Sequence, residues 1–197
     1  MRLLENFCIS KINNEIFSKI NGKSYKTDCT VPLENLRHLS LLHKDLNGKT
    51  LSGEMICNVK IAEDLIDIFQ KLFKASYPIE QIRLIDEYDA DDELSMRDNN
   101  SSCFNFRFVS FTQRISKHGY GLAVDINPLY NPYIKTVDGK KIIAPDNSAD
   151  FEDREKSFPY KIVEDDLCCQ LFREHKFLWG GNCWDDEKDY QHFFIEQ

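Results

Sequence analysis

Two segments far apart in the chain, residues 116–125 and 189–192, constrain the fold more than any other feature. The first contains a histidine and an aspartate separated by glycines, and the second contains an aspartate followed three residues later by a histidine. Two imidazoles and a carboxylate are typical ligands of zinc, and three protein ligands leave a fourth position open for chemistry. We therefore expect a fold that brings both segments to one zinc ion, with three ligands: His118, Asp125 and His192.

The spacing within each segment is compatible with this zinc site. Gly119 and Gly121 allow the backbone to turn sharply beside His118, and a following strand can return Asp125 to the same point. A turn before His192 would place Asp189 next to the open zinc position, where it could act as a base. The alternative is that both histidines are ordinary core or surface residues, which fits either segment alone better than the two together.

The length and charge of the chain narrow the classes of function. A chain of 197 residues predicts one domain with a substantial core. The net charge of −8 argues against a nucleic-acid partner, because phosphate binding needs clustered lysine and arginine. No apolar run is long enough to span a membrane, and the start of the chain lacks the apolar region of a signal peptide. We expect a cytoplasmic protein as encoded, or one released by a non-classical route or trimmed of its leader.

Other residues that could take part in chemistry, the cysteines and the remaining histidines, are expected to be structural. The seven cysteines are odd in number and form no Cys-x-x-Cys pair, so reduced and mostly buried thiols are predicted. The three remaining histidines are placed on predicted helices or their exits and are also expected to be structural: His38, His43 and His175.

The hydrophobic pattern predicts an α+β fold in one domain, with a small, mostly antiparallel sheet that carries the zinc site and helices packed to one side. Helices are predicted at residues 33–42, 61–76 and 164–175. Strands are predicted at residues 54–59, 79–88, 103–109, 121–126 and 190–195. Residues 86–100 are predicted to form an exposed loop, and residues 137–140 a type I′ hairpin turn.

The pattern Ser-x-His-x-x-Gly-x-Ala-x-Asp, followed later by Asp-x-x-His-Phe, resembles the D-alanyl-D-alanine carboxypeptidase (VanY-like) family of zinc peptidases. This family is related to D-Ala-D-Ala dipeptidases and to phage L-alanyl-D-glutamate endopeptidases. Four further segments resemble its bacterial members: residues 95–100, 104–107, 125–128 and 177–181. The resemblance favours a division into residues 1–53, an N-terminal extension with a short helix packed on the core, and residues 54–197, the zinc peptidase core.

The resemblance implies the same three zinc ligands and makes Asp189 the general base and acid. It also indicates Arg107, ahead of the zinc motif, as the arginine that binds substrate and stabilises the oxyanion. Arg114 is the second choice for this role. Ser116 is expected to hydrogen-bond the substrate or orient the loop, with a turn cap as the alternative interpretation.

One departure from the family lies directly after the last ligand. The family often continues His-Phe-Glu, whereas this chain has Phe194 at the position of the glutamate, and Glu196 is too far along to replace it. The departure concerns the groups that orient a ligand and not the ligands themselves. Trp179 and Trp184 are interpreted either as walls of the cleft or as core residues.

The function implied by the resemblance is zinc-dependent hydrolysis of a peptide bond in bacterial peptidoglycan stem peptides, with D-Ala-D-Ala carboxypeptidase favoured. A lysin-type L-alanyl-D-glutamate endopeptidase is the alternative, and such an enzyme would act at the cell wall. A non-catalytic, zinc-containing wall-binding module is the alternative of another class. That alternative predicts loss of the base, so Asp189 favours an enzyme. The oligomeric state stays open, with a monomer favoured.

Overall fold

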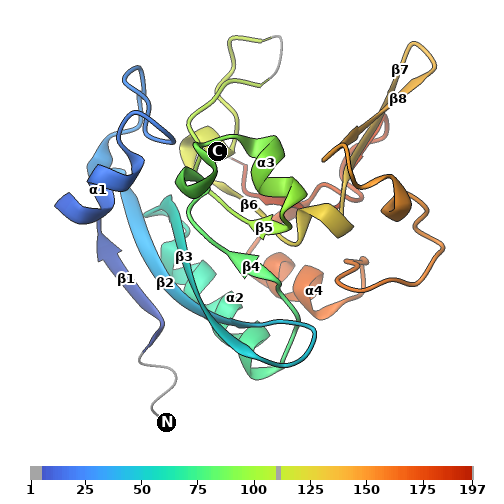
Figure 1. The fold of residues 1–197 in the computed structure, drawn as a ribbon, viewed down its shortest axis with the longest axis horizontal. Coiled ribbons are helices and arrows are strands. Elements are labelled where there is room, and N and C mark those ends of the chain that lie inside the picture. The colour runs from blue at the N-terminus through green and yellow to red at the C-terminus, as the bar shows by residue number, and fades with distance from the viewer. Residues whose placement is uncertain (1–5, 110–111, 197) are drawn as a thin grey trace.

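The computed structural model describes residues 6–109 and 112–196, and within them it has an α+β fold (Figure 1). This confirms the predicted class. The strands are distributed over several small, mostly antiparallel sheets, and the described residues include four α-helices. Their bounds are α1 Asn14–Ile20, α2 Ala62–Lys74, α3 Asp92–Arg97 and α4 Leu167–Glu174. No helix in the described part of the chain is both long and apolar enough to cross a membrane.

The N-terminal sheet consists of β1 (Cys8–Lys11), β2 (Leu36–Lys44) and β3 (Thr50–Asn58), in that order and antiparallel. The predicted helix at residues 33–42 is wrong, because most of this segment is β2. Both faces of β2 are covered: Leu39 packs into the core cluster of α2, and Leu36 into the cluster of α1. A strand buried on both faces carries apolar residues without simple alternation. Here the leucines recur at every third residue, which is a spacing typical of a helix. The pairing of β2 with β3 crosses the division predicted after residue 53, and that division stays a prediction.

Helices α2 and α4 confirm the helices predicted at residues 61–76 and 164–175. Helix α2 buries one apolar face and has acidic residues in its first turn and lysines in its last, as its dipole favours. Helix α4 begins after Asp166, whose side chain accepts a hydrogen bond from the backbone N–H of Cys169. It packs against α2, and His175 at its end contacts Asp64 and Asp67 of that helix.

The region between α2 and the zinc motif differs most from the prediction. The strand predicted at residues 79–88 is reduced to β4 (Gln81–Ile82), which pairs in parallel with β5 (Asn100–Ser101). Residues 86–100 are not simply an exposed loop, since they include α3 and the buried Asp86. Residues 103–109 form no strand in the described structure beyond an isolated bridge at Phe108. Helix α3 depends on the side-chain cap provided by Asp91 rather than on an apolar repeat.

The C-terminal half contains two three-stranded antiparallel sheets. One has the order β6 (Ala123–Asp125), β11 (His192–Phe194), β9 (Leu178–Trp179). The other has the order β10 (Glu187–Asp189), β7 (Tyr133–Val137), β8 (Lys140–Ala144), and its β7–β8 hairpin projects from the molecule (Figure 1). Asp138 and Gly139 both have positive φ, which confirms the predicted type I′ turn. Strands β6 and β11 confirm the strands predicted around the two zinc-site segments.

Candidate metal centre

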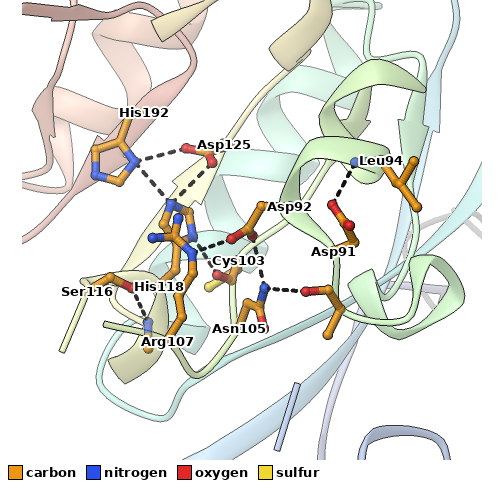
Figure 2. Close-up of polar contacts among 12 residues, drawn as sticks. Asp91, Asp92, Leu94, Cys103, Asn105, Arg107, Ser116, His118, Asp125 and His192 are labelled. Carbon is orange, nitrogen blue, oxygen red and sulfur yellow. Dashed lines mark hydrogen bonds and ion pairs between the residues drawn. The ribbon is translucent and has the colours of Figure 1, made fainter. Parts of the chain in front are cut away.

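Strand pairing brings the two segments of the zinc motif together. In the register of β6 and β11, His192 lies directly opposite Asp125. His118 reaches the same point from the 3-10 helix His118–Tyr120, which precedes β6. His192 Nδ1 lies 2.9 Å from Asp125 Oδ1, and His118 Nε2 lies 3.2 Å from Asp125 Oδ2 and 3.1 Å from His192 Nδ1 (Figure 2). The three side chains therefore converge on one point, as the sequence predicted.

A backbone carbonyl fixes the orientation of His118. Its Nδ1 lies 2.6 Å from the carbonyl oxygen of Cys103, an acceptor, so Nδ1 carries the proton. The lone pair then belongs to Nε2, the atom that faces Asp125 and His192. His118 is buried, and this arrangement of donor and acceptor is how proteins commonly orient a metal-binding imidazole.

The geometry of the cluster fits a zinc ion. Ligand bonds of about 2.0–2.1 Å in a tetrahedron place neighbouring ligand atoms roughly 3.3 Å apart. The two imidazole nitrogens lie 3.1 Å apart, and each lies 2.9–3.2 Å from one oxygen of the Asp125 carboxylate, which is close to this spacing. Two imidazole nitrogens and a carboxylate also match the ligand preferences of zinc, so His118, Asp125 and His192 form a potential metal site.

The charges within the cluster support one another. Burial on its own raises the pKa of Asp125, but the charges and hydrogen bonds of His118 and His192 outweigh it and hold that pKa far below its usual range. Burial lowers the pKa of His118, and the charge and hydrogen bond of Asp125 outweigh this in turn, so that this pKa is raised. Asp125 is therefore an anion in this setting, the form in which a carboxylate binds a metal ion.

Asp189 lies at the end of β10, beside the metal cluster. Its backbone N–H donates to the carbonyl of Gly180. The two segments approach closely here, because a Cβ atom added to Gly180 would lie only 2.6 Å from the carbonyl oxygen of Asp189. Its Oδ1 atom is buried and has no hydrogen-bond partner among the described residues. Burial raises the pKa of Asp189 to about 7, against the opposing charge of His192 and with a further increase from Asp125. A carboxyl group of this kind exchanges a proton near neutral pH.

The structure distinguishes between the two candidate arginines. The side chain of Arg107 lies beside His118, and its Nε forms an ion pair with Asp92 (Figure 2). The charge of Arg107 acts on both His118 and Asp189. Arg114 is exposed, and among the described residues its side chain makes no ion pair. Arg107 is therefore the arginine at the cluster.

Ser116 is buried, and its hydroxyl oxygen accepts a hydrogen bond of 2.9 Å from the backbone N–H of Gly119. This contact matches the interpretation of Ser116 as a turn cap that orients the loop of His118. The substrate-binding role of Ser116 stays a prediction.

Aromatic side chains surround His192 at the position of the family departure. Phe194 stacks on the imidazole with ring centroids 5.3 Å apart, and Trp184 lies nearly parallel to Phe194 at 5.4 Å. Trp179 packs against the core and is partly buried, since it stacks on Phe193 and its indole N–H donates to the carbonyl of Tyr190. The stack of Trp184 and Phe194 on His192 was not predicted, because it depends on a loop whose path the sequence pattern does not reveal.

Two further groups at the cluster were also missed. They are the carbonyl of Cys103, which orients His118, and Asp92, which pairs with Arg107. A backbone carbonyl leaves no mark on the sequence. Asp92 belongs to an acid-rich segment that resembled an exposed loop, and no residue pattern connected it with Arg107.

Comparison with known protein families finds a match for the part of the chain that contains this cluster. Residues 110–195 match the sequence model of a family described as D-alanyl-D-alanine carboxypeptidase. No curated protein and no solved structure matches the chain. The matched segment includes all three potential ligands and Asp189. The match supports zinc-dependent peptidase activity on peptidoglycan in general. It confirms that residues 110–195 resemble the D-alanyl-D-alanine carboxypeptidase family, whose members are zinc enzymes.

Proposed function

We propose that the protein is a zinc-dependent D-Ala-D-Ala carboxypeptidase that removes the terminal D-alanine from peptidoglycan stem peptides. The observation that carries the proposal is the convergence of His118, Asp125 and His192 within a segment that matches this family. The half-buried carboxylate of Asp189 beside them adds a group suited to proton transfer. A general zinc-binding module has no need of such a group.

Each residue of the cluster has a distinct task in this proposal. His118, Asp125 and His192 hold the zinc ion, which when bound supplies a Lewis acid that polarises a carbonyl and lowers the pKa of water. Asp189 accepts a proton from the attacking water and donates it to the leaving amine. Arg107 donates hydrogen bonds to the oxyanion that develops on the scissile carbonyl.

The bond that is cut distinguishes carboxypeptidase from endopeptidase. Purified zinc-loaded protein is incubated with an intact stem pentapeptide that ends in D-Ala-D-Ala, and the products are identified by mass spectrometry. Release of a single D-alanine supports the proposal. Cleavage between L-alanine and D-glutamate assigns the protein to the endopeptidase alternative, and no cleavage of either bond contradicts both.

Replacing Asp189 distinguishes an enzyme from a non-catalytic wall-binding module. We expect Asp189→Ala to lower turnover by about 10²–10⁴-fold, the usual contribution of a general acid or base. Bound zinc, measured by elemental analysis, stays near one ion per chain because Asp189 is not a ligand. Asp186→Ala is the matched control on the same segment, since this exposed acid lies outside the cluster. Turnover that survives Asp189→Ala contradicts the assigned mechanism.

A further inference from the structure

Asp92, at the start of α3, links that helix to the metal cluster. One oxygen of its carboxylate, Oδ2, forms an ion pair with Nε of Arg107, and the other, Oδ1, accepts a hydrogen bond of 2.9 Å from the side-chain amide of Asn105 (Figure 2). Among the described residues, the carboxylate that forms an ion pair with the Arg107 guanidinium is that of Asp92. Since the pairing uses Nε, the two terminal nitrogens of Arg107 remain available to another ligand.

The backbone of Arg107 is fixed against the loop of His118. The carbonyl of Arg107 accepts a hydrogen bond of 2.9 Å from the N–H of Ser116. A Cβ atom on Gly119 would lie only 2.9 Å from that carbonyl oxygen and 3.3 Å from the backbone nitrogen of Arg107. The two segments of the backbone therefore approach closely. The start of the Arg107 side chain is thus held next to His118, and only its side-chain torsions remain to be set.

The carboxylate of Asp92 is itself held from two directions. Asp91 caps α3 by accepting a hydrogen bond of 3.0 Å from the N–H of Leu94, which fixes the turn that carries Asp92. The amide of Asn105 donates both to Asp92 and, at 3.1 Å, to the carbonyl of Ala90. The N–H of Asn105 in turn donates to the carbonyl of His118. Asp92 is therefore part of a continuous framework that ends at the metal cluster.

The ion pair is only partly buried, although the Nε atom of Arg107 is itself shielded from solvent. The side chains of Arg107 and Asp92 are 34% and 31% exposed. Ion pairs that reach solvent contribute only about 0–1 kcal/mol to folding. Orientation is different, because a guanidinium must be aimed before the reaction to stabilise charge that develops in the transition state.

We propose that Asp92 is the positioning residue of Arg107: it holds Nε so that the terminal nitrogens are directed toward the oxyanion of the substrate. This inference rests on the proposed peptidase function and extends it to α3, which lies outside the segment that matches the family. Asp92 does not touch the reacting atoms and acts through Arg107.

The test compares two neighbouring acids of the same helix. We expect Asp92→Asn to lower kcat for the stem pentapeptide by about 10–100-fold, because support for an oxyanion donor is lost, and to leave KM nearly unchanged. Bound zinc and the melting temperature stay close to those of the wild type. Glu93→Gln is the matched control: it also removes one carboxylate from α3, but Glu93 accepts a hydrogen bond from the N–H of Asp146 and does not pair with Arg107, so kcat stays within about twofold. Asp92→Glu restores part of the lost kcat, because it returns the charge at a different reach.

A double-variant cycle establishes whether Asp92 acts through Arg107. In an Arg107→Ala background, adding Asp92→Asn should change kcat by less than about twofold, since the group to be positioned is already gone. Equal effects of Asp92→Asn in both backgrounds contradict the inference, as does a wild-type kcat for Asp92→Asn. If Asp92→Asn fails to fold, Asp92→Glu is compared in the same two backgrounds with the same criteria. Wild-type protein that cuts no stem peptide contradicts the proposed function instead, so the two failures are distinguishable.

Discussion

His43 on β2 and His118 at the metal cluster have almost the same environment on one side of the ring. Both are buried, and in both Nδ1 lies against a backbone carbonyl, at 2.7 Å from Ile79 in one case and 2.6 Å from Cys103 in the other. The difference lies at the second ring nitrogen. In His118 this atom faces Asp125 and His192, whereas in the described structure no carboxylate forms an ion pair with His43.

This difference reverses the effect of burial. Burial lowers the pKa of His43, and its hydrogen bonds do not compensate. At His118 the charge of Asp125 outweighs burial, and the pKa is raised. A buried histidine anchored to a carbonyl is therefore not by itself a sign of metal binding. What distinguishes the candidate ligand is a second nitrogen that meets an anion and another imidazole.

The largest effect is expected from removing the anion that creates this difference. Asp125→Ala should reduce bound zinc to near zero and lower turnover by roughly 10³-fold or more, as when a central catalytic group is lost. His43→Gln is the control and should retain one zinc ion per chain. Elemental analysis and the stem-peptide assay measure both. A fully active Asp125→Ala protein would show that the carboxylate is not a ligand.

An intermediate effect is expected from the aromatic stack on His192. Trp184→Leu should weaken zinc binding by about 10-fold, in the range found for groups that orient a ligand. Competition with a chelator of known affinity gives the change. Trp179→Leu is the matched control, because Trp179 packs on Phe193 in the core and should affect stability more than zinc affinity. Equal zinc affinities of the wild type and Trp184→Leu would mean that stacking does not orient His192.

The smallest effect concerns pH and the N-terminal sheet. Since the folded-state pKa values of His38 and His43 are lowered by burial, the unfolded chain binds more protons below pH 6.5. The free energy of unfolding should fall as the pH drops below 6.5, by at most about 1.4 kcal/mol per pH unit for each histidine. His43→Gln should flatten the dependence of the free energy of unfolding on pH. Urea denaturation at about pH 5 and about pH 7 measures it, because these values lie on either side of the unperturbed histidine pKa of about 6.5. An unchanged slope would contradict the role of His43 as a neutral buried residue.

The parts of the structure that could be predicted are those encoded by local repetition. The apolar face of α2 and the positive-φ pair Asp138-Gly139 each follow from neighbouring residues alone. The three residues of the potential metal site were also predicted, because the full string of Ser, His, Gly, Ala and Asp, combined with the later Asp-x-x-His, is far more specific than either histidine alone. Arg107 was found through the family resemblance and not from spacing.

The parts that could not be predicted depend on tertiary contacts. Strand β2 resembled a helix because it is covered on both faces, and α3 lacks any apolar repeat because a cap begins it. The pairing of Asp92 with Arg107 and the contact of His118 with the carbonyl of Cys103 join residues that share no pattern. Such contacts emerge only when the chain path is known.

The stack of Trp184, Phe194 and His192 gives the protein an optical reporter of its own. Trp184 is one of two tryptophans in the chain, and its ring centroid lies 6.1 Å from that of the potential ligand His192. An open-shell ion such as Co²⁺ quenches the fluorescence of a nearby indole, whereas closed-shell Zn²⁺ does not. Exchange of one metal for the other can therefore be followed by emission from the unlabelled protein, with Trp184→Leu, which retains only the emission of Trp179, as the reference.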